Sequence, residues 1–158
     1  MAFTRIPREP TSWATALVRP RIPAFAAVAS WMAPGSWHQT TEEEFAETGP
    51  QYFEAIGEKY LERGALILGL VEEAHPREDH WYLPFIGTRP ERQGQGLGSK
   101  LLQHMGERLD RDGLAAYLEA SSERSRALYL RHGFEATGEI TLPDGPSIWP
   151  MWRAPRGG

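Results

Sequence analysis

The sequence predicts a single domain of the α/β (α+β) class, with helices packed against a sheet. At 158 residues the chain can bury one sizeable core but is short for two ordinary domains. Hydrophobic patterns typical of strands and of helices alternate along its second half. A glycine-rich turn at residues 93–98 joins the end of a strand pattern directly to an amphipathic helical pattern.

Composition narrows the range of functions. Hydrophobic residues make up 41% of the chain and charged residues 24%, as in ordinary globular proteins. The formal net charge of −4 gives no general attraction to nucleic acid or anionic lipid, and it favours a cationic amine as partner. The absence of cysteine excludes disulfides, thiolate metal sites and an acyl-cysteine intermediate. Because no apolar run approaches the roughly 20 residues of a membrane span, and the start lacks a signal-peptide core, we expect a cytoplasmic protein.

The first half of the chain carries the weaker structural signals. Residues 1–23 are rich in proline and arginine, which predicts an irregular arm before a single domain at residues 24–158. Residues 24–32 form a short apolar run that fits a buried strand, and a helix fits it as well. Two threonines followed by three glutamates at residues 40–44 have the pattern of a capped helix start. Apolar residues recur at helical spacing over residues 51–74 and predict a second helix.

The second half gives clearer patterns. Residues 81–88 fit a strand. From Gly96 onward, the apolar stripe between Leu97 and Leu109 predicts an amphipathic helix that Asp112-Gly113 ends. Three further elements are expected in order: a strand at 114–120, a helix at 122–131, and a terminal hairpin that pairs 134–142 with 147–153.

Gly94, Gly96 and Gly98 make the turn at 93–98 the most informative segment of the chain. Without Cβ atoms they let a bulky anion approach the backbone N–H groups, and the following helix adds the positive end of its dipole. The expected ligand is a phosphate or pyrophosphate. The spacing fits neither the P-loop nor the dinucleotide fingerprint, whose third glycine comes three residues after the second. A turn that merely starts a helix is the alternative.

Three stretches follow one another as they do in the GNAT superfamily of N-acetyltransferases: residues 80–102, which contain Gln93-x-x-Gly96-x-Gly98, residues 116–121 and residues 127–135. The sequence resembles this superfamily from about Ala27 to its C-terminus. The tail at 142–153 is similar to the puromycin N-acetyltransferase group within it. The first 23 residues do not resemble the strand and helices with which family members begin.

The resemblance implies a mixed, mostly antiparallel central sheet that is flanked by helices and splayed where acetyl-CoA binds as co-substrate. It places the pantetheine arm along the backbone of Ile86, Gly87 and Thr88. It places the pyrophosphate on the turn and the first helical residues: Gln93, Gly94, Gln95, Gly96, Leu97, Gly98 and Ser99. Ser125 stands where puromycin-type relatives carry an asparagine, and a serine there hydrogen-bonds the cofactor with shorter reach. Arg92 and Lys100 either add charge to this site or are simply solvated.

Two residues match positions that move protons in the family. Tyr129 stands where the family places the tyrosine near the thioester sulfur, and a phenol with a reference pKa of about 10 can protonate a departing thiolate. Alternatively, Tyr129 packs between helix and sheet with its hydroxyl satisfied. Glu119 ends a strand where some members carry a glutamate that takes the proton of the amine, directly or through water. It fits equally well as a structural acid that binds a backbone amide or Arg124.

Other polar residues fit structural roles better. Glu72, Glu73 and His80 are reserve bases, and we expect each to be solvated. His75 and His80 lie in a charged turn and match no metal-ligand spacing, so no metal site is predicted.

The tryptophans divide into two groups. Trp81, Trp149 and Trp152 lie in predicted strands, where core packing explains them. Trp31 and Trp37 flank a Pro-Gly turn and fit either the core or an aromatic substrate pocket.

Together these features predict an enzyme that transfers acetyl directly from acetyl-CoA to a primary amine of a small molecule, for example an aminonucleoside antibiotic. The alternative is a non-catalytic acyl-CoA-binding or interaction module on the same fold, because the family's N-terminal elements are not recognisable. A missing first strand would also leave a sheet edge unpaired, which either the arm or a partner chain in a homo-oligomer would cover.

Overall fold

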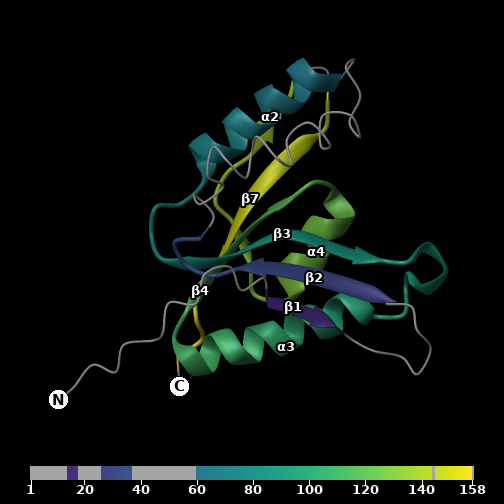
Figure 1. Cartoon of the computed structure of the whole chain (residues 1–158), viewed down its shortest axis with the longest axis vertical. Helices are drawn as coiled ribbons and strands as arrows, with labels where there is room; N and C mark the ends of the chain where they lie inside the picture. Colours follow the sequence, from purple (N-terminus) through teal and green to yellow (C-terminus); the bar gives the residue numbers. More distant parts are fainter. Residues whose placement is uncertain (1–13, 18–25, 37–59, 144, 158) are drawn as a thin grey trace.

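A central sheet organises the computed structural model, which describes residues 14–17, 26–36, 60–143 and 145–157. Within these residues seven strands pair in the order β1-β2-β3-β4-β7-β5, and β6 pairs with β7 outside this path (Figure 1). All pairings are antiparallel except that of β3 with β4. The predicted mixed, mostly antiparallel sheet is therefore confirmed.

The first strand comes from the segment predicted to be an irregular arm. β1 (Ala14–Leu17) pairs antiparallel with β2 (Ala27–Met32), so that Ala14 lies opposite Trp31 and Leu17 opposite Val28. The prediction of irregular structure is wrong at these residues, since pairing with β2 gives this short stretch the partner that its sequence does not reveal. β1 also covers the edge of β2. The sequence predicts that either the N-terminal arm or a partner chain covers this edge, and β1 belongs to the arm. For residues 27–32 the choice between strand and helix is settled in favour of strand.

The sheet opens between β3 (His80–Thr88) and β4 (Ala115–Ala120). These parallel strands are paired only from His80 to Tyr82, although β3 stays paired with β2 as far as Thr88 and β4 with β7 as far as Ala120. The register between β2 and β3 shifts around Leu83 and Pro84, which places an extra residue in β3. Proline lacks the N–H that a central strand donates and is found at such bulges. The predicted splay of the sheet is confirmed, and the bulge at Pro84 explains where it begins.

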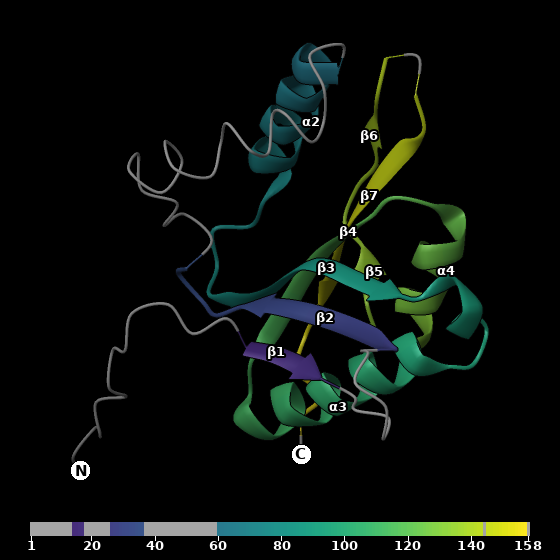
Figure 2. The ribbon, with the colours of Figure 1, turned by 45° about the vertical axis from the view of Figure 1, so that its right-hand side comes forward.

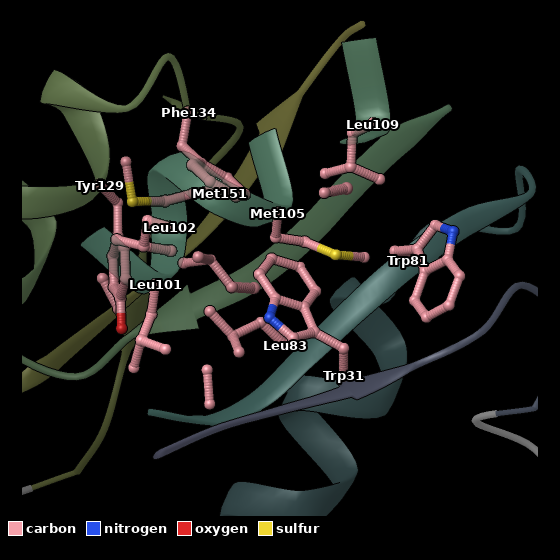
Figure 3. Close-up of a cluster of buried hydrophobic side chains, with 14 of the residues drawn as sticks. Trp31, Trp81, Leu83, Leu101, Leu102, Met105, Leu109, Tyr129, Phe134 and Met151 are labelled. Atoms are coloured by element: carbon pink, nitrogen blue, oxygen red, sulfur yellow. The ribbon is translucent and has the colours of Figure 1, made fainter. Parts of the chain in front are cut away.

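Two helices cover one face of the sheet. α3 (Leu97–Asp112) ends at Gly113, whose φ of 67° is the left-handed conformation favoured at helix C-termini, and α4 (Glu123–Arg131) follows β4. The predicted stripe of α3 is buried in the core (Figure 3), together with residues of the strands and of α4: Trp31, Trp81, Leu83, Leu101, Leu102, Met105, Leu109, Leu118, Tyr129, Phe134 and Met151. Trp31 therefore belongs to the core rather than to a substrate pocket, whereas Trp37 lies outside the described residues.

The remaining elements gather at one end of the molecule. α2 (Leu61–Ala74) stands at the same end as the hairpin formed by β6 (Ile140–Thr141) and β7 (Ser147–Arg153), as Figure 2 shows. The predicted hairpin is confirmed, with β5 (Glu135–Ala136) and β6 as two short pairings to β7.

The predicted helix at 51–74 is confirmed from Leu61 onward; its first part, and the helix start at 40–44, lie outside the described residues. Leu68 of α2, one of the residues with that helical spacing, is 54% exposed, so the spacing predicted the helix but not the burial of this residue. No helix in the described part of the chain is both long and apolar enough to cross a membrane.

Candidate active site

The glycine turn leaves a set of backbone donors unpaired at the start of α3. Gly94 and Gly96 have φ values of 76° and 74°, a conformation that side chains disfavour. The first helical hydrogen bond runs from the Lys100 N–H to the Gly96 carbonyl over 3.0 Å. The N–H groups of Leu97, Gly98 and Ser99 therefore have no acceptor within the helix. These donors and the helix dipole together suit an anion.

This cradle lies where β3, α3 and α4 converge. A Cβ added at Gly98 would lie 3.6 Å from Cδ2 of Leu128 and 3.9 Å from Cδ1 of Ile86. The Ser99 hydroxyl lies 2.6 Å from Nε2 of His132, at the end of α4. No acidic side chain stands in the first turn of α3.

The predicted pantetheine segment occupies the free part of β3. Ile86, Gly87 and Thr88 pair with β2 on one side. On the other side the register with β4 has already ended at Tyr82, so no described strand pairs with them there. Their backbone groups can therefore offer peptide-like hydrogen bonds to a ligand that enters between the strands.

Tyr129 lies in α4 and is 6% exposed, with its ring edge-on to Phe134 at 6.0 Å between centroids. Burial raises its pKa, so the phenol keeps its proton at neutral pH. Figure 3 shows the ring beside Leu101 and Leu102. No hydrogen bond to the Tyr129 hydroxyl occurs among the described residues. This differs from the alternative role considered for Tyr129, in which it packs between helix and sheet with its hydroxyl hydrogen-bonded.

Ser125 caps α4 together with Ser122. The Ser125 N–H donates to the Ser122 hydroxyl over 3.2 Å, and the Ser122 N–H donates to the Ser125 hydroxyl over 3.1 Å. This reciprocal pair is a capping box, which supplies partners to N–H groups that the helix start leaves unpaired. The hydroxyl predicted to meet the cofactor therefore has a structural partner as well.

A polar cluster lies on the other face of the sheet. We call it the histidine–glutamate cluster, and its members are His75, His80, Tyr82, Tyr117 and Glu119. The Tyr82 hydroxyl donates to Oε2 of Glu119 over 2.9 Å, and Nδ1 of His75 lies 3.8 Å from Oε1 of Glu119. Nε2 of His75 lies 3.0 Å from Nε2 of His80, whose Nδ1 lies 2.6 Å from the carbonyl oxygen of Glu78.

Burial shifts the pKa of three members of the cluster. Burial raises the pKa of Tyr82 and of Tyr117, and the nearby Glu119 carboxylate raises both further, so the two phenols stay protonated. Burial lowers the pKa of His80, which is therefore neutral at pH 7. Oε1 of Glu119 is buried, and both His75 and the Tyr117 hydroxyl lie near this carboxylate. A buried carboxylate oxygen in this position is suited to receive a proton.

A groove of about 610 Å³ opens beside the cluster. Pro150 and Trp152 line it, and they are the cross-strand partners of Glu119 and Tyr117, so the groove and the cluster share one face of the sheet. Its other lining residues come from the α2–β3 turn and from the segment around β6: Ala74, Pro76, Glu78, Thr137, Gly138, Glu139 and Ile140. The groove thus combines an aromatic and apolar floor with two carboxylates.

Several sequence predictions change here. His80 is 1% exposed and is not solvated, because it packs beneath the turn between α2 and β3, whereas Glu72 and Glu73 are exposed as expected. Trp152 lines the groove as well as contacting His80, with ring centroids 5.5 Å apart.

Sequence reasoning missed Tyr82 and Tyr117. The alternation of His80 with Tyr82 and of Tyr117 with Glu119, at two-residue spacing on neighbouring strands, was the available signal.

Comparisons with known proteins agree with this geometry. A model of the Acetyltransferase (GNAT) family matches residues 22–134, more than half of the chain. An uncharacterized N-acetyltransferase of Schizosaccharomyces pombe is 27% identical over 125 residues, which are 75% of this chain and 51% of that protein. The 5-NmdU N-acetyltransferase of Pseudomonas phage PaMx11 is 34% identical over 70 residues, 44% of this chain and 50% of that protein. The chain spans about half the length of these curated relatives.

Solved structures give the same fold. A Corynebacterium glutamicum crystal structure described as histone acetyltransferase HPA2 and related acetyltransferase superposes with a TM-score of 0.60 at 27% identity, covering 90% of this chain and 64% of that one. The ribosomal-protein-S18-alanine N-acetyltransferase of Escherichia coli superposes with a TM-score of 0.56 at 18% identity, covering 95% and 74%. The chain belongs to the acetyltransferase (GNAT) family.

Proposed function

We propose that this protein transfers an acetyl group from acetyl-CoA directly to a primary amine of a small cationic molecule. One observation carries the proposal. β3 and β4 separate between two candidate half-sites. The anion cradle and the buried Tyr129 lie on one face of the sheet, and the buried carboxylate oxygen of Glu119 lies beside the groove on the other face. Such an arrangement suits a donor that enters from one face and an acceptor that enters from the other.

The residues present fit acetyl-CoA. The unpaired N–H groups of Leu97, Gly98 and Ser99, without an acid in the first turn of α3, suit a pyrophosphate, and Gln93, Gly94, Gln95 and Gly96 form its approach. The free edge of Ile86, Gly87 and Thr88 suits the amide groups of pantetheine, and Ser125 would add a hydrogen bond with a shorter reach than that of an asparagine. Bound acetyl-CoA supplies the acetyl group as a thioester, whose carbonyl an amine can attack.

Two side chains would move protons. Glu119, whose Oε1 is buried, accepts the proton of the incoming ammonium directly or through water, which makes the amine a nucleophile. The Tyr129 hydroxyl, kept protonated by its burial, donates to the departing thiolate. Holding both groups at the splay of the sheet replaces a bimolecular encounter by an oriented one.

The groove supports a cationic acceptor. Among its described lining residues, Glu78 and Glu139 are acidic and none is basic, and Trp152 and Ile140 offer an apolar surface. An amine on an apolar or aromatic skeleton would satisfy both features, and an aminonucleoside antibiotic is one such molecule. The relative named as a 5-NmdU N-acetyltransferase supports N-acetyl transfer to an amine.

The experiment is a thiol-release assay with acetyl-CoA and a panel of amines: 1,4-diaminobutane, 2-phenylethylamine, an aminonucleoside, an aminoglycoside and a peptide N-terminus. We expect amine-dependent release of CoA with at least one small amine. Tight binding of acetyl-CoA with no release for any amine would instead support the non-catalytic acyl-CoA-binding module.

A further inference from the structure

His75 is a buried histidine that the proposed chemistry has not used. Its side chain is 2% exposed, and it lies in the turn between α2 and β3 with Nδ1 3.8 Å from Oε1 of Glu119. Its ring also packs edge-on against Tyr82 and Tyr117, at 4.7 Å between centroids in each case. Burial against two aromatic rings holds the imidazole in one orientation.

The hydrogen bonds around His75 fix where its protons lie. The Glu78 carbonyl can only accept, so Nδ1 of His80 carries a hydrogen and donates to it over 2.6 Å. Because burial keeps His80 neutral, its Nε2 has a lone pair and accepts. Nε2 of His75, 3.0 Å away, must therefore be the donor. This chain of bonds turns Nδ1 of His75 toward the carboxylate of Glu119.

Glu119 is constrained from its other side. Tyr82, which stays protonated, donates to Oε2 over 2.9 Å. Oε1 and Nδ1 of His75 then lie 3.8 Å apart, so a proton can pass between them once this contact shortens. Contacts of this kind are often long without substrate and shorten when it binds.

We propose that His75 and Glu119 act together as the base for the acceptor amine. This inference rests on the proposed acetyl transfer. The N–H bond of the substrate ammonium breaks as an O–H bond forms on the Glu119 carboxylate, directly or through a water molecule that passes its own proton on, and the proton then moves from Oε1 to Nδ1 of His75. The positive charge moves from the ammonium to an imidazolium that is paired with the restored carboxylate. After the product leaves, the proton returns to water through Glu119 and the groove.

The pairing makes chemical sense because a carboxylate alone is a weak base. The reference pKa of His lies about two units above that of Glu, so imidazole holds the proton about a hundredfold more firmly. The titratable groups that face the pair are His80 and Tyr82 on β3, Tyr117 on β4 and Glu78 in the turn. His75 acts through Glu119 and is a positioning residue in this scheme.

The test compares His75→Gln with His104→Gln, a matched change at an exposed position of α3. The pH dependence of kcat/KM is measured with 1,4-diaminobutane, or with the panel amine that the wild-type protein acetylates fastest, and acetyl-CoA affinity by calorimetry. We expect His75→Gln to lower kcat at least tenfold, to move the acid limb of the profile to lower pH and to leave acetyl-CoA affinity within twofold. His104→Gln should match the wild-type protein. An acid limb that stays in place in His75→Gln would overturn the proposal.

A second readout does not depend on turnover. Nitrogen-15 NMR of the wild-type protein at neutral pH should show the hydrogen of His80 on Nδ1 and a hydrogen of His75 on Nε2. A His75 that carries hydrogen only on Nδ1 would overturn the proposal even if every amine failed in the assay. Failure of all amines with the expected hydrogens in place would count against the proposed function and leave the geometry of the pair supported.

Discussion

Glu119 and Tyr129 lie on opposite faces of the central sheet. Tyr129 packs into the core beneath α3 with Leu118 and Ala120, whereas Glu119, which alternates with these residues along β4, bonds to Tyr82 on the other face. One reaction can use both only where β3 and β4 have separated. The point near Pro84 where β3 has a bulge against β2 and leaves β4 is therefore as important to the proposed chemistry as either side chain.

The first prediction concerns Tyr129. Replacing it by Phe removes a hydroxyl that has no partner among the described residues, so the free energy of unfolding should change by less than about 0.5 kcal/mol. Loss of a general acid should lower kcat by about 10²–10⁴-fold at constant acetyl-CoA affinity. Denaturant unfolding measures the stability, steady-state kinetics measure kcat, and calorimetric titration measures the acetyl-CoA affinity. Tyr60→Phe, at a tyrosine that is 52% exposed, is the matched control. Unchanged turnover in Tyr129→Phe would remove the acid assignment.

The glycine turn gives a prediction with opposite signs at two neighbouring positions. Gly96→Ala places a side chain at a φ of 74° and should destabilise the protein by about 1–2 kcal/mol. Gly98 lies in α3, where a Cβ would make ordinary contacts, so Gly98→Ala should stabilise the protein by roughly 0.5–1 kcal/mol through helix propensity. Urea unfolding measures both. Equal effects of the two changes would contradict the described turn.

The turn was predictable because its information is local. The spacing of Gly94, Gly96 and Gly98 describes a backbone shape and an unpaired helix start without reference to the rest of the fold. The apolar stripe of α3 was equally local, since one helical period selects the buried face. The strand assignments from β3 onward followed from short apolar runs with clear boundaries.

What the sequence could not show depends on contacts between distant segments. β1 is a short strand in a proline-rich stretch, and only its pairing with β2 identifies it. His80 resembles a solvated residue of a charged turn, yet the packing of Tyr117 and Trp152 buries it. Leu68 belongs to the apolar residues at helical spacing but is exposed, because α2 stands away from the core. Burial of this kind is a property of the assembled sheet.

Ser122 and Ser125 separate capping from cofactor binding. Each alanine substitution removes half of the capping box and should cost about 1 kcal/mol in the free energy of unfolding. Only Ser125→Ala should also weaken acetyl-CoA binding, by severalfold, because Ser125 is the member predicted to meet the cofactor. Calorimetric titration of both variants provides the comparison. Equal acetyl-CoA affinities of the two variants would show that Ser125 caps α4 and does not bind the cofactor.

The ion pair between Asp110 and Arg153 predicts a pH-dependent stability. Arg153 is 3% exposed, and the hydrogen bond from its Nη2 over 2.7 Å holds the pKa of Asp110 below its usual value. A carboxyl with a depressed folded pKa stabilises the fold above its unfolded pKa, about 3.9, and this contribution is lost as pH falls through the folded value. Asp110→Asn should therefore cost about 1.5–3 kcal/mol at pH 7, and the difference should shrink below pH ~4.

Denaturant titrations between pH 7 and pH 3 measure this difference. Asp112→Asn is the matched control, because its partners Arg108 and Arg111 are both exposed, and it should change stability by less than about 0.5 kcal/mol. A deficit of Asp110→Asn that is the same at both ends of the pH range would show that the charge of Asp110 is not what stabilises the pair.

The most direct test of acetyl transfer across the splayed sheet is the turnover of Glu119→Gln at saturating acetyl-CoA. Glutamine keeps an oxygen for the Tyr82 hydrogen bond but cannot take a proton from the amine. We predict a fall in amine-dependent CoA release of about 10²–10⁴-fold, with acetyl-CoA affinity within twofold of wild type and Glu123→Gln, at an exposed glutamate of α4, unaffected. Wild-type turnover in Glu119→Gln would contradict the central claim.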